Sequence, residues 1–331
     1  MKDGKKITAS REESTSYMNQ TLPMRESFDL IQRDLMIGER MASFYFINGL
    51  NKDDDMLKLM DALLKIKKED MPAGILQFME MAIPYTEVEL IEDFDQVLKN
   101  LFSGVTCLFV DGYEGAIAID CRTYPARSVE EPDKDKSLRG SRDGFVETVV
   151  SNTAMIRRRI RSEHLVMEMQ EVGDSSRTDI AICYMKDRVN KEILCDLRQK
   201  VLSIRTDDLR MNQQSLAECL MKRKWYNPFP KFKFTERPDT AAACLFEGKV
   251  VLLVDNSPSA MILPTSILDV IEEANDYYFP TLTRVYLKSA RGLISFLTIF
   301  LTPVFLLLMQ NLNWLPKMFA FVAVKDMINI P

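Results

Sequence analysis

Histidine and cysteine are the side chains in this chain that could form a zinc site or take part in a nucleophile–base pair. The sequence of 331 residues has one histidine, His164, and six cysteines, none of them in a C-x-x-C pair. Neither a zinc site of the common spacings nor a Ser-His-Asp triad with a recognisable nucleophile can be assembled from that pattern. We therefore expect His164 to be a surface residue and the cysteines to be reduced and mostly buried. No catalytic or metal site is expected.

Two further segments have residue types that could hold a ligand. Residues 139–144 form a glycine-containing stretch, but it lacks the Lys-Ser/Thr ending and the preceding apolar strand of a phosphate-binding loop. Acidic residues 130–133 lack the D-x-D-x-D-G order of a calcium loop. We expect a turn before a helix in the first case, a solvated loop in the second, and no cofactor.

Arginines are crowded at one end of a predicted helix over residues 143–161, where Asp143 is expected to cap the first turn. One interpretation is that Arg157, Arg158, Arg159 and Arg161 complement the helix dipole. The other is that they contact an anion or an acidic partner. Four basic residues in five positions cannot share one face, so their roles should differ. Because Arg157 and Arg161 lie four positions apart beside an apolar stripe, we expect these two to be desolvated.

Nucleic acid is excluded as the partner of this arginine cluster. The chain has 43 Lys+Arg against 48 Asp+Glu and a formal net charge of -5, whereas nucleic-acid binders show a basic excess over a domain. The cluster also has no interleaved aromatic residues on which bases could stack.

The elements around the cluster predict a mixed α/β fold of two small subdomains joined by a linking helix and followed by one transmembrane helix. Alternating apolar patterns predict strands near residues 28–37, 41–48, 165–172 and 178–184, and amphipathic helices between them. We expect a disordered tail over residues 1–27, subdomain 1 over 28–138, and the linking helix over 139–163. Subdomain 2 is expected over 164–279, including a helix over 267–278, and the membrane helix with a short extracytoplasmic end over 280–331.

The membrane helix is predicted from residues 292–316, a run of 25 positions without a charged side chain. As a helix, this run would cover roughly 37 Å, enough to cross a hydrocarbon core of about 30 Å. Leu293 begins its apolar centre, Pro303 lies mid-span near Thr298 and Thr302, and Trp314 takes an interfacial position. We expect the two threonine hydroxyls to help satisfy the carbonyl that Pro303 frees. Basic residues before the span predict a single pass with the N-terminal region in the cytoplasm.

Several long motifs resemble the A-subunit family of bacterial spore germinant receptors, the GerA family. They occupy residues 139–148, 152–161, 227–230, 235–239 and 247–258. Residues 120–127, 130–132 and 276–280 are most similar to the family's sporulation-stage members. The resemblance covers nearly the whole chain.

The resemblance implies a cytoplasmic region of two α/β subdomains, a linking helix and several membrane helices in the spore inner membrane. It implies contact with membrane lipid, with other copies of the chain and with other germinant-receptor subunits, in oligomeric channels that release ions at germination. This sequence has one predicted membrane helix where the family has several, as expected for a truncated product, a fragment or half of a split gene. Two functions remain open: a channel or receptor subunit, and a membrane-anchored interaction module without a pore of its own.

Overall fold

The computed structural model describes residues 5–83, 87–124, 143–173, 177–204, 212–220, 231–266 and 279–310. The chain divides into two compact units, Met1–Thr265 and Ser266–Pro331. The first unit contains two five-stranded antiparallel sheets, and the second contains a long helix. The mixed α/β class predicted from the sequence is confirmed.

The described residues of 5–124 build the first sheet and its helices, here called the first repeat. Its strand order is β1-β2-β4-β5-β3. The central strands β4 and β5 are buried along their whole length, which explains why their sequences are continuous apolar runs rather than alternating patterns. The elements are α1 (Arg11–Thr21), β1 (Leu30–Ile37), β2 (Arg40–Ile47), α2 (Asp53–Leu64), the 3-10 helix η1 (Lys68–Asp70), α3 (Ile75–Ala82), β3 (Val88–Ile91), α4 (Phe94–Phe102), β4 (Thr106–Val110) and β5 (Ala116–Ile119).

The described residues of 143–265 build the second sheet, here called the second repeat, with the strand order β6-β7-β9-β10-β8. Apart from the 3-10 helix η1, its described helices and strands follow one another in the same order as those of the first repeat. The elements are α5 (Val149–Arg159), β6 (Leu165–Val172), β7 (Thr178–Met185), α6 (Lys191–Leu202), α7 (Asn212–Leu220), β8 (Lys233–Thr235), α8 (Pro238–Phe246), β9 (Val250–Val254) and β10 (Ala260–Leu263).

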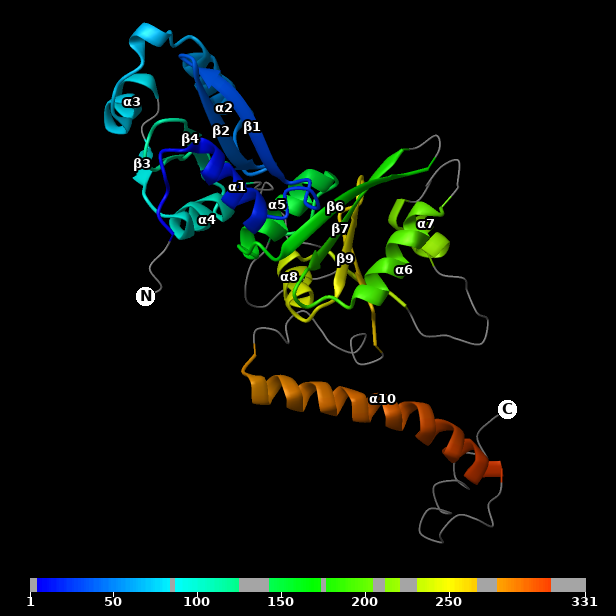
Figure 1. Ribbon diagram of the computed structural model, residues 1–331. Helices are drawn as coiled ribbons and strands as arrows, with labels where there is room; N and C mark the ends of the chain where they lie inside the picture. Colours follow the sequence, from blue (N-terminus) through cyan, green and yellow to red (C-terminus); the bar gives the residue numbers. More distant parts are fainter. Residues whose placement is uncertain are drawn as a thin grey trace. The chain divides into compact units, whose positions relative to one another are not determined.

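Helices cover both faces of each sheet, so each sheet has two apolar cores. In the first repeat, α1 and α4 pack on one face and α2 and α3 on the other. In the second repeat, α5 and α8 pack on one face and α6 and α7 on the other, as Figure 1 shows for the green and yellow elements. By this arrangement α5 is the equivalent of α1.

The equivalence of α1 and α5 extends to how each helix is capped. The Arg11 N–H, the first of α1, donates to the Asp111 carboxylate after β4 at 3.2 Å. The Val149 N–H, the first of α5, donates to the Asp255 carboxylate after β9 at 3.0 Å. Three backbone hydrogen bonds match in the same way, from Ile7, Asp111 and Gly112 in the first repeat and from Phe145, Asp255 and Asn256 in the second. The first compact unit is therefore one folded pattern used twice.

This pattern corrects the disordered tail expected over residues 1–27. Within the described residues from 5 onward, α1 is an integral helix whose Met18 is 0% exposed, and Leu22 just after it is 3% exposed. The Ser10 hydroxyl accepts the Glu13 N–H at its start. The polar composition of residues 11–21 concealed the helix, because the apolar contact comes chiefly from one buried methionine.

The linking helix also differs from its predicted bounds. It begins at Val149 rather than Asp143, and residues 143–148 precede it as non-helical chain in which the Phe145 N–H donates to the Glu236 carbonyl at 2.8 Å. Asp255, 106 residues away, takes the capping role expected of Asp143. The helix packs on α8 and the second sheet, so it is the first element of the second repeat.

The second unit contains α10 (Thr281–Gln310), and its segment Thr281–Leu307 is, within the described residues, the one helix long and apolar enough to cross a membrane. Leu293 is exposed and Pro303 lies inside the helix. The predicted Trp314 and the predicted helix over 267–278 lie outside the described residues.

The hydrogen bonds of the Thr298 and Thr302 hydroxyls in α10 differ from those expected. Thr298 donates to the Ile294 carbonyl at 2.8 Å and Thr302 to the Thr298 carbonyl at 3.0 Å. Each therefore bonds four residues back along its own helix, and neither turns to Ile299, whose carbonyl Pro303 leaves without its usual donor.

Candidate functional site at the repeat junction

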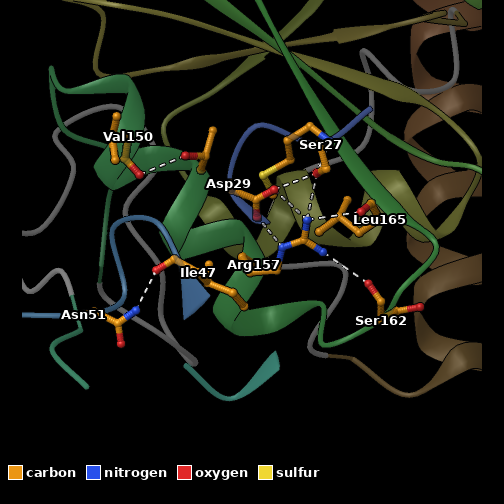
Figure 2. Close-up of polar contacts among 10 residues, drawn as sticks. Ser27, Asp29, Ile47, Asn51, Val150, Arg157, Ser162 and Leu165 are labelled. Carbon is orange, nitrogen blue, oxygen red and sulfur yellow. Dashed lines mark hydrogen bonds and ion pairs between the residues drawn. The ribbon is translucent and has the colours of Figure 1, made fainter. Parts of the chain in front are cut away.

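Arg157, in the last turn of α5, is the largest side chain that is completely buried in the described residues. Its Nε donates to Asp29 Oδ2 at 2.6 Å and its Nη2 to Asp29 Oδ1 at 3.0 Å. The Asp29 side chain is 2% exposed. Figure 2 shows the planar guanidinium facing this carboxylate in the two-pronged geometry that arginine and carboxylate groups favour. The pair joins the two repeats.

The remaining donors of Arg157 are also engaged. Nη1 donates to the Ser162 carbonyl at 3.1 Å, and Nη2 donates to the Leu165 carbonyl at 3.1 Å. Nη2 also reaches the Ser27 hydroxyl at 3.3 Å, and that hydroxyl donates to Asp29 at 2.6 Å. Because every charged group has partners, the burial cost of the two ions is offset by hydrogen bonds as well as by their mutual attraction.

The segment that contributes Ser27 and Asp29 also pairs with the outer edge of the second sheet. The Phe28 N–H donates to the Met167 carbonyl at 3.0 Å, and the Met167 N–H donates to the Ser27 hydroxyl at 3.0 Å. Met167 belongs to β6, an edge strand whose outward backbone groups would otherwise need water. The junction therefore combines a buried ion pair with edge-strand pairing.

A close backbone approach completes the junction along the same face of α5, because Val150, Ala154 and Arg157 are spaced i, i+4 and i+7. Gly49, after β2, has a φ of 81°, and a Cβ there would lie 3.1 Å from Val150 Cγ1 and 3.1 Å from Ala154 Cβ. Ala154 is part of the first repeat's core although it belongs to α5. Only glycine allows this turn to lie directly against the helix.

The other residues of the arginine cluster have different surroundings, as their spacing required. The Arg158 guanidinium lies 4.1 Å from the centre of the Tyr124 ring. Arg159 forms an ion pair with Asp143 and donates to the Met155 carbonyl at 3.0 Å. Arg161, which we expected to be desolvated with Arg157, is exposed.

The sequence identified Arg157 as a desolvated arginine but missed its partners. Asp29 precedes Arg157 by 128 residues, and no sequence pattern connects the two. Ser27 lay at the end of the segment expected to be a disordered tail. Nothing local to either residue distinguishes it from an ordinary polar residue before a strand.

The buried thiols of Cys107 and Cys183 have low reactivity. Burial raises the pKa of Cys107 to about 12, and burial also raises the pKa of Cys183, with the Asp29 charge adding to the effect. Both thiols therefore stay protonated at neutral pH. Among the described residues, no group of three His, Cys, Asp or Glu side chains could hold a metal ion.

Comparison with protein families gives one extended match. Residues 16–331 match the model of the Bacillus/Clostridium GerA spore germination protein family. The chain is 35% identical over 319 residues to stage V sporulation protein AF of Bacillus subtilis, covering 95% of this chain and 64% of that protein. It is 25% identical over 309 residues to spore germination protein A1 of the same organism, covering 93% of this chain and 63% of that protein.

A solved structure has the same fold. The chain superposes with a TM-score of 0.59 on the crystal structure of the N-terminal domain of the A subunit of the Bacillus megaterium spore germinant receptor GerK3, at 22% identity. The alignment covers 80% of this chain and 99% of that domain. The chain spans less than two thirds of the two curated relatives described above.

Proposed function

This chain belongs to the GerA spore germination protein family, and we propose that it acts as a membrane subunit of an oligomeric germinant receptor or ion channel in the spore inner membrane. Its proposed partners are other copies of itself, other germinant-receptor subunits and membrane lipid. The roles in the names of its relatives, stage V sporulation and spore germination, support an action in this process. We propose a non-enzymatic role, with the two repeats as its cytoplasmic subdomains.

The proposed orientation places both repeats in the cytoplasm, which in a spore is the core. Arg284, Lys288 and Arg291 precede the uncharged run of α10, and positively charged flanks stay on the cytoplasmic side of a membrane helix. In this arrangement α10 crosses the membrane once, and its exposed apolar side chains contact lipid.

The buried Arg157–Asp29 pair is the observation that supports a signalling role for the cytoplasmic region. A buried ion pair adds little net stability but strongly disfavours any arrangement that leaves one charge unpaired. The pair therefore fixes how the two repeats meet, and α10 follows the second repeat in the chain. We propose that the junction holds both repeats as one body so that a change in either affects the membrane helix.

The test replaces the natural gene with variants of Arg157 in a spore-forming host. Arg157→Ala should impair ion release and the loss of optical density at germination, whereas Arg161→Ala, an exposed residue of the same cluster, should not. Immunoblots of the inner-membrane fraction must show equal amounts of both variants. Normal germination of Arg157→Ala spores at equal protein level would refute the signalling role.

An anchored interaction module is the alternative function. It is favoured by the single helix that could cross a membrane in the described residues. Ion flux measured in vesicles that contain only the purified chain separates the two. Flux supports the channel subunit, whereas co-purification with other receptor subunits but no flux from the chain alone supports the module.

A further inference from the structure

The turn that presses against α5 contains the one Asn-Gly pair of the whole sequence, Asn48–Gly49. The Leu50 N–H donates to the Ile47 carbonyl across the turn at 3.2 Å. Gly49 has a φ of 81°, and Asn48 is not among the residues with positive φ, which makes this a type II turn.

An asparagine followed by glycine can lose its side-chain amide without any enzyme. The Gly49 backbone nitrogen attacks the Asn48 side-chain carbonyl carbon, a new C–N bond forms, and the side-chain nitrogen leaves as ammonia with the proton from the Gly49 N–H. Water then opens the cyclic imide at either carbonyl, giving aspartate or isoaspartate. The net change exchanges ammonia for water and needs no oxidant, metal or cofactor. Glycine favours the attack because no side chain shields its nitrogen.

The reacting groups at this turn are not held by other bonds. The Asn48 backbone N–H donates to the Asp29 carbonyl at 2.8 Å. Within the described part of the chain, the Asn48 side chain and the Gly49 N–H have no hydrogen-bond partner. Only the turn keeps them apart, because a type II turn points the Gly49 nitrogen away from the side-chain carbonyl. Ring closure requires rotation about the Asn48 Cα–C bond, which opens the Leu50–Ile47 hydrogen bond.

We propose that Asn48–Gly49 is a site of spontaneous deamidation whose rate is set by closure of the repeat junction. While α5 lies against the turn, rotation of the Asn48–Gly49 peptide is restrained and the reaction is slow. When the repeats separate at the junction, the turn relaxes and the reaction accelerates. The modification therefore records how long the junction has been open.

The product does not fit the closed junction. Isoaspartate inserts a methylene group into the backbone beside Gly49, where an added Cβ would already lie 3.2 Å from the Val150 carbonyl oxygen and 3.1 Å from Ala154 Cβ. Contacts this short require the helix or the turn to move. Deamidation at Asn48 thus loosens the contact between the turn and α5.

Peptide mapping of the full chain, incubated in detergent micelles at neutral pH, tests the proposal. The peptide containing Asn48 should gain about one dalton and become a substrate for isoaspartyl methyltransferase. Peptides containing Asn19 and Asn256 in the same digest are the internal controls and should remain unmodified. Arg157→Lys, which weakens the two-pronged pair, should raise the rate at Asn48 about fivefold or more. The same rate in the two proteins would overturn the proposal.

A second measurement keeps the test decisive if Arg157→Lys does not fold. The wild-type chain in urea gives the rate of the open turn, and the native rate must be clearly lower. In addition, the wild-type chain should become more sensitive to protease at the junction during incubation, whereas Asn48→Gln should not. Equal native and unfolded rates, or equal protease sensitivity of the aged wild type and aged Asn48→Gln, would contradict the proposal.

Discussion

Arg157 and Asn48 both contact Asp29, the first through its guanidinium and the carboxylate at 2.6 Å, the second through its backbone N–H and the Asp29 carbonyl at 2.8 Å. A single residue before β1 thus joins the last turn of α5 to the turn after β2. Both side chains of the ion pair are shielded from solvent, so breaking the pair should produce a measurable change in the free energy of unfolding.

Arg157→Ala should lower the free energy of unfolding of the 1–265 polypeptide by about 3–5 kcal/mol, because it leaves the Asp29 charge buried and unpaired. Arg161→Ala should change it by no more than about 1 kcal/mol, because Arg161 is exposed. Urea unfolding followed by circular dichroism measures both.

The double substitution Asp29→Leu with Arg157→Met is the matched control for this prediction. It removes both charges, and we expect it to be more stable than Arg157→Ala alone. Equal losses in Arg157→Ala and Arg161→Ala would show that the pair contributes no more than a solvated helix end.

Removal of residues 1–27 should destabilise the first repeat. The deletion exposes the core under α1 by removing Met18 and Leu22, each worth about 1.5–3 kcal/mol when fully buried, and it removes Ser27 from the junction. The measurement compares the melting temperatures of 1–265 and 28–265, with 5–265 as the control that should match 1–265. A 28–265 polypeptide that melts like the longer ones would mean that α1 is dispensable.

The predictions for Arg157 and for α1 show which features of the structure could be inferred from sequence patterns and which could not. The strands were predictable where alternating apolar residues identify a strand, as in β1 and β6. The helix α1 was not, because its stability depends on Asp111, 100 residues away, and on one buried methionine. Helical geometry predicted two desolvated arginines, Arg157 and Arg161, and it was right for Arg157 but wrong for Arg161. The partner of Arg157 was not predictable, since no local rule relates residues from different repeats.

Stability should fall with acid partly through Asp34 in β1. Burial alone would raise the pKa of Asp34, but hydrogen bonds from Ser43, Gln32 and Arg11 outweigh it and hold the pKa below its ordinary value. Since the folded pKa is the lower one, this contribution is present above the unfolded pKa of about 3.9 and is lost as pH falls through the folded pKa.

The substitution Asp34→Asn tests this pH dependence. The variant should be less stable than the wild type at neutral pH, and the difference should shrink as the pH falls below about 4, where the wild-type carboxyl becomes protonated. Melting temperatures measured across this range provide the comparison. A difference that stays constant with pH would mean that the carboxylate charge is not the source.

Gly49→Ala should destabilise the chain by more than about 1 kcal/mol, because it combines a positive φ with contacts to Val150 and Ala154. Gly74→Ala is the matched control, since no atom lies within 4 Å of the added Cβ and φ is -115°. That change should stay within about 0.5 kcal/mol. Similar losses at both positions would argue against a close approach at the junction.

Because the fold contains two repeats, equivalent positions can be compared within one sequence, a comparison that usually requires many related sequences. Asp111 and Asp255 occupy the same place in the two repeats and are both aspartate. The fold therefore requires a carboxylate at this position in each repeat, to accept the first N–H of the equivalent helix. Asn19 and Arg157 are each the ninth residue of equivalent helices, yet they differ. Gene duplication followed by divergence would produce this mixture, with shared residues inherited for folding and unlike residues acquired separately by each half. Arginine at position 157 would then have arisen in the second half only, after the two halves were fused and shared an interface that Arg157 stabilises by pairing with Asp29.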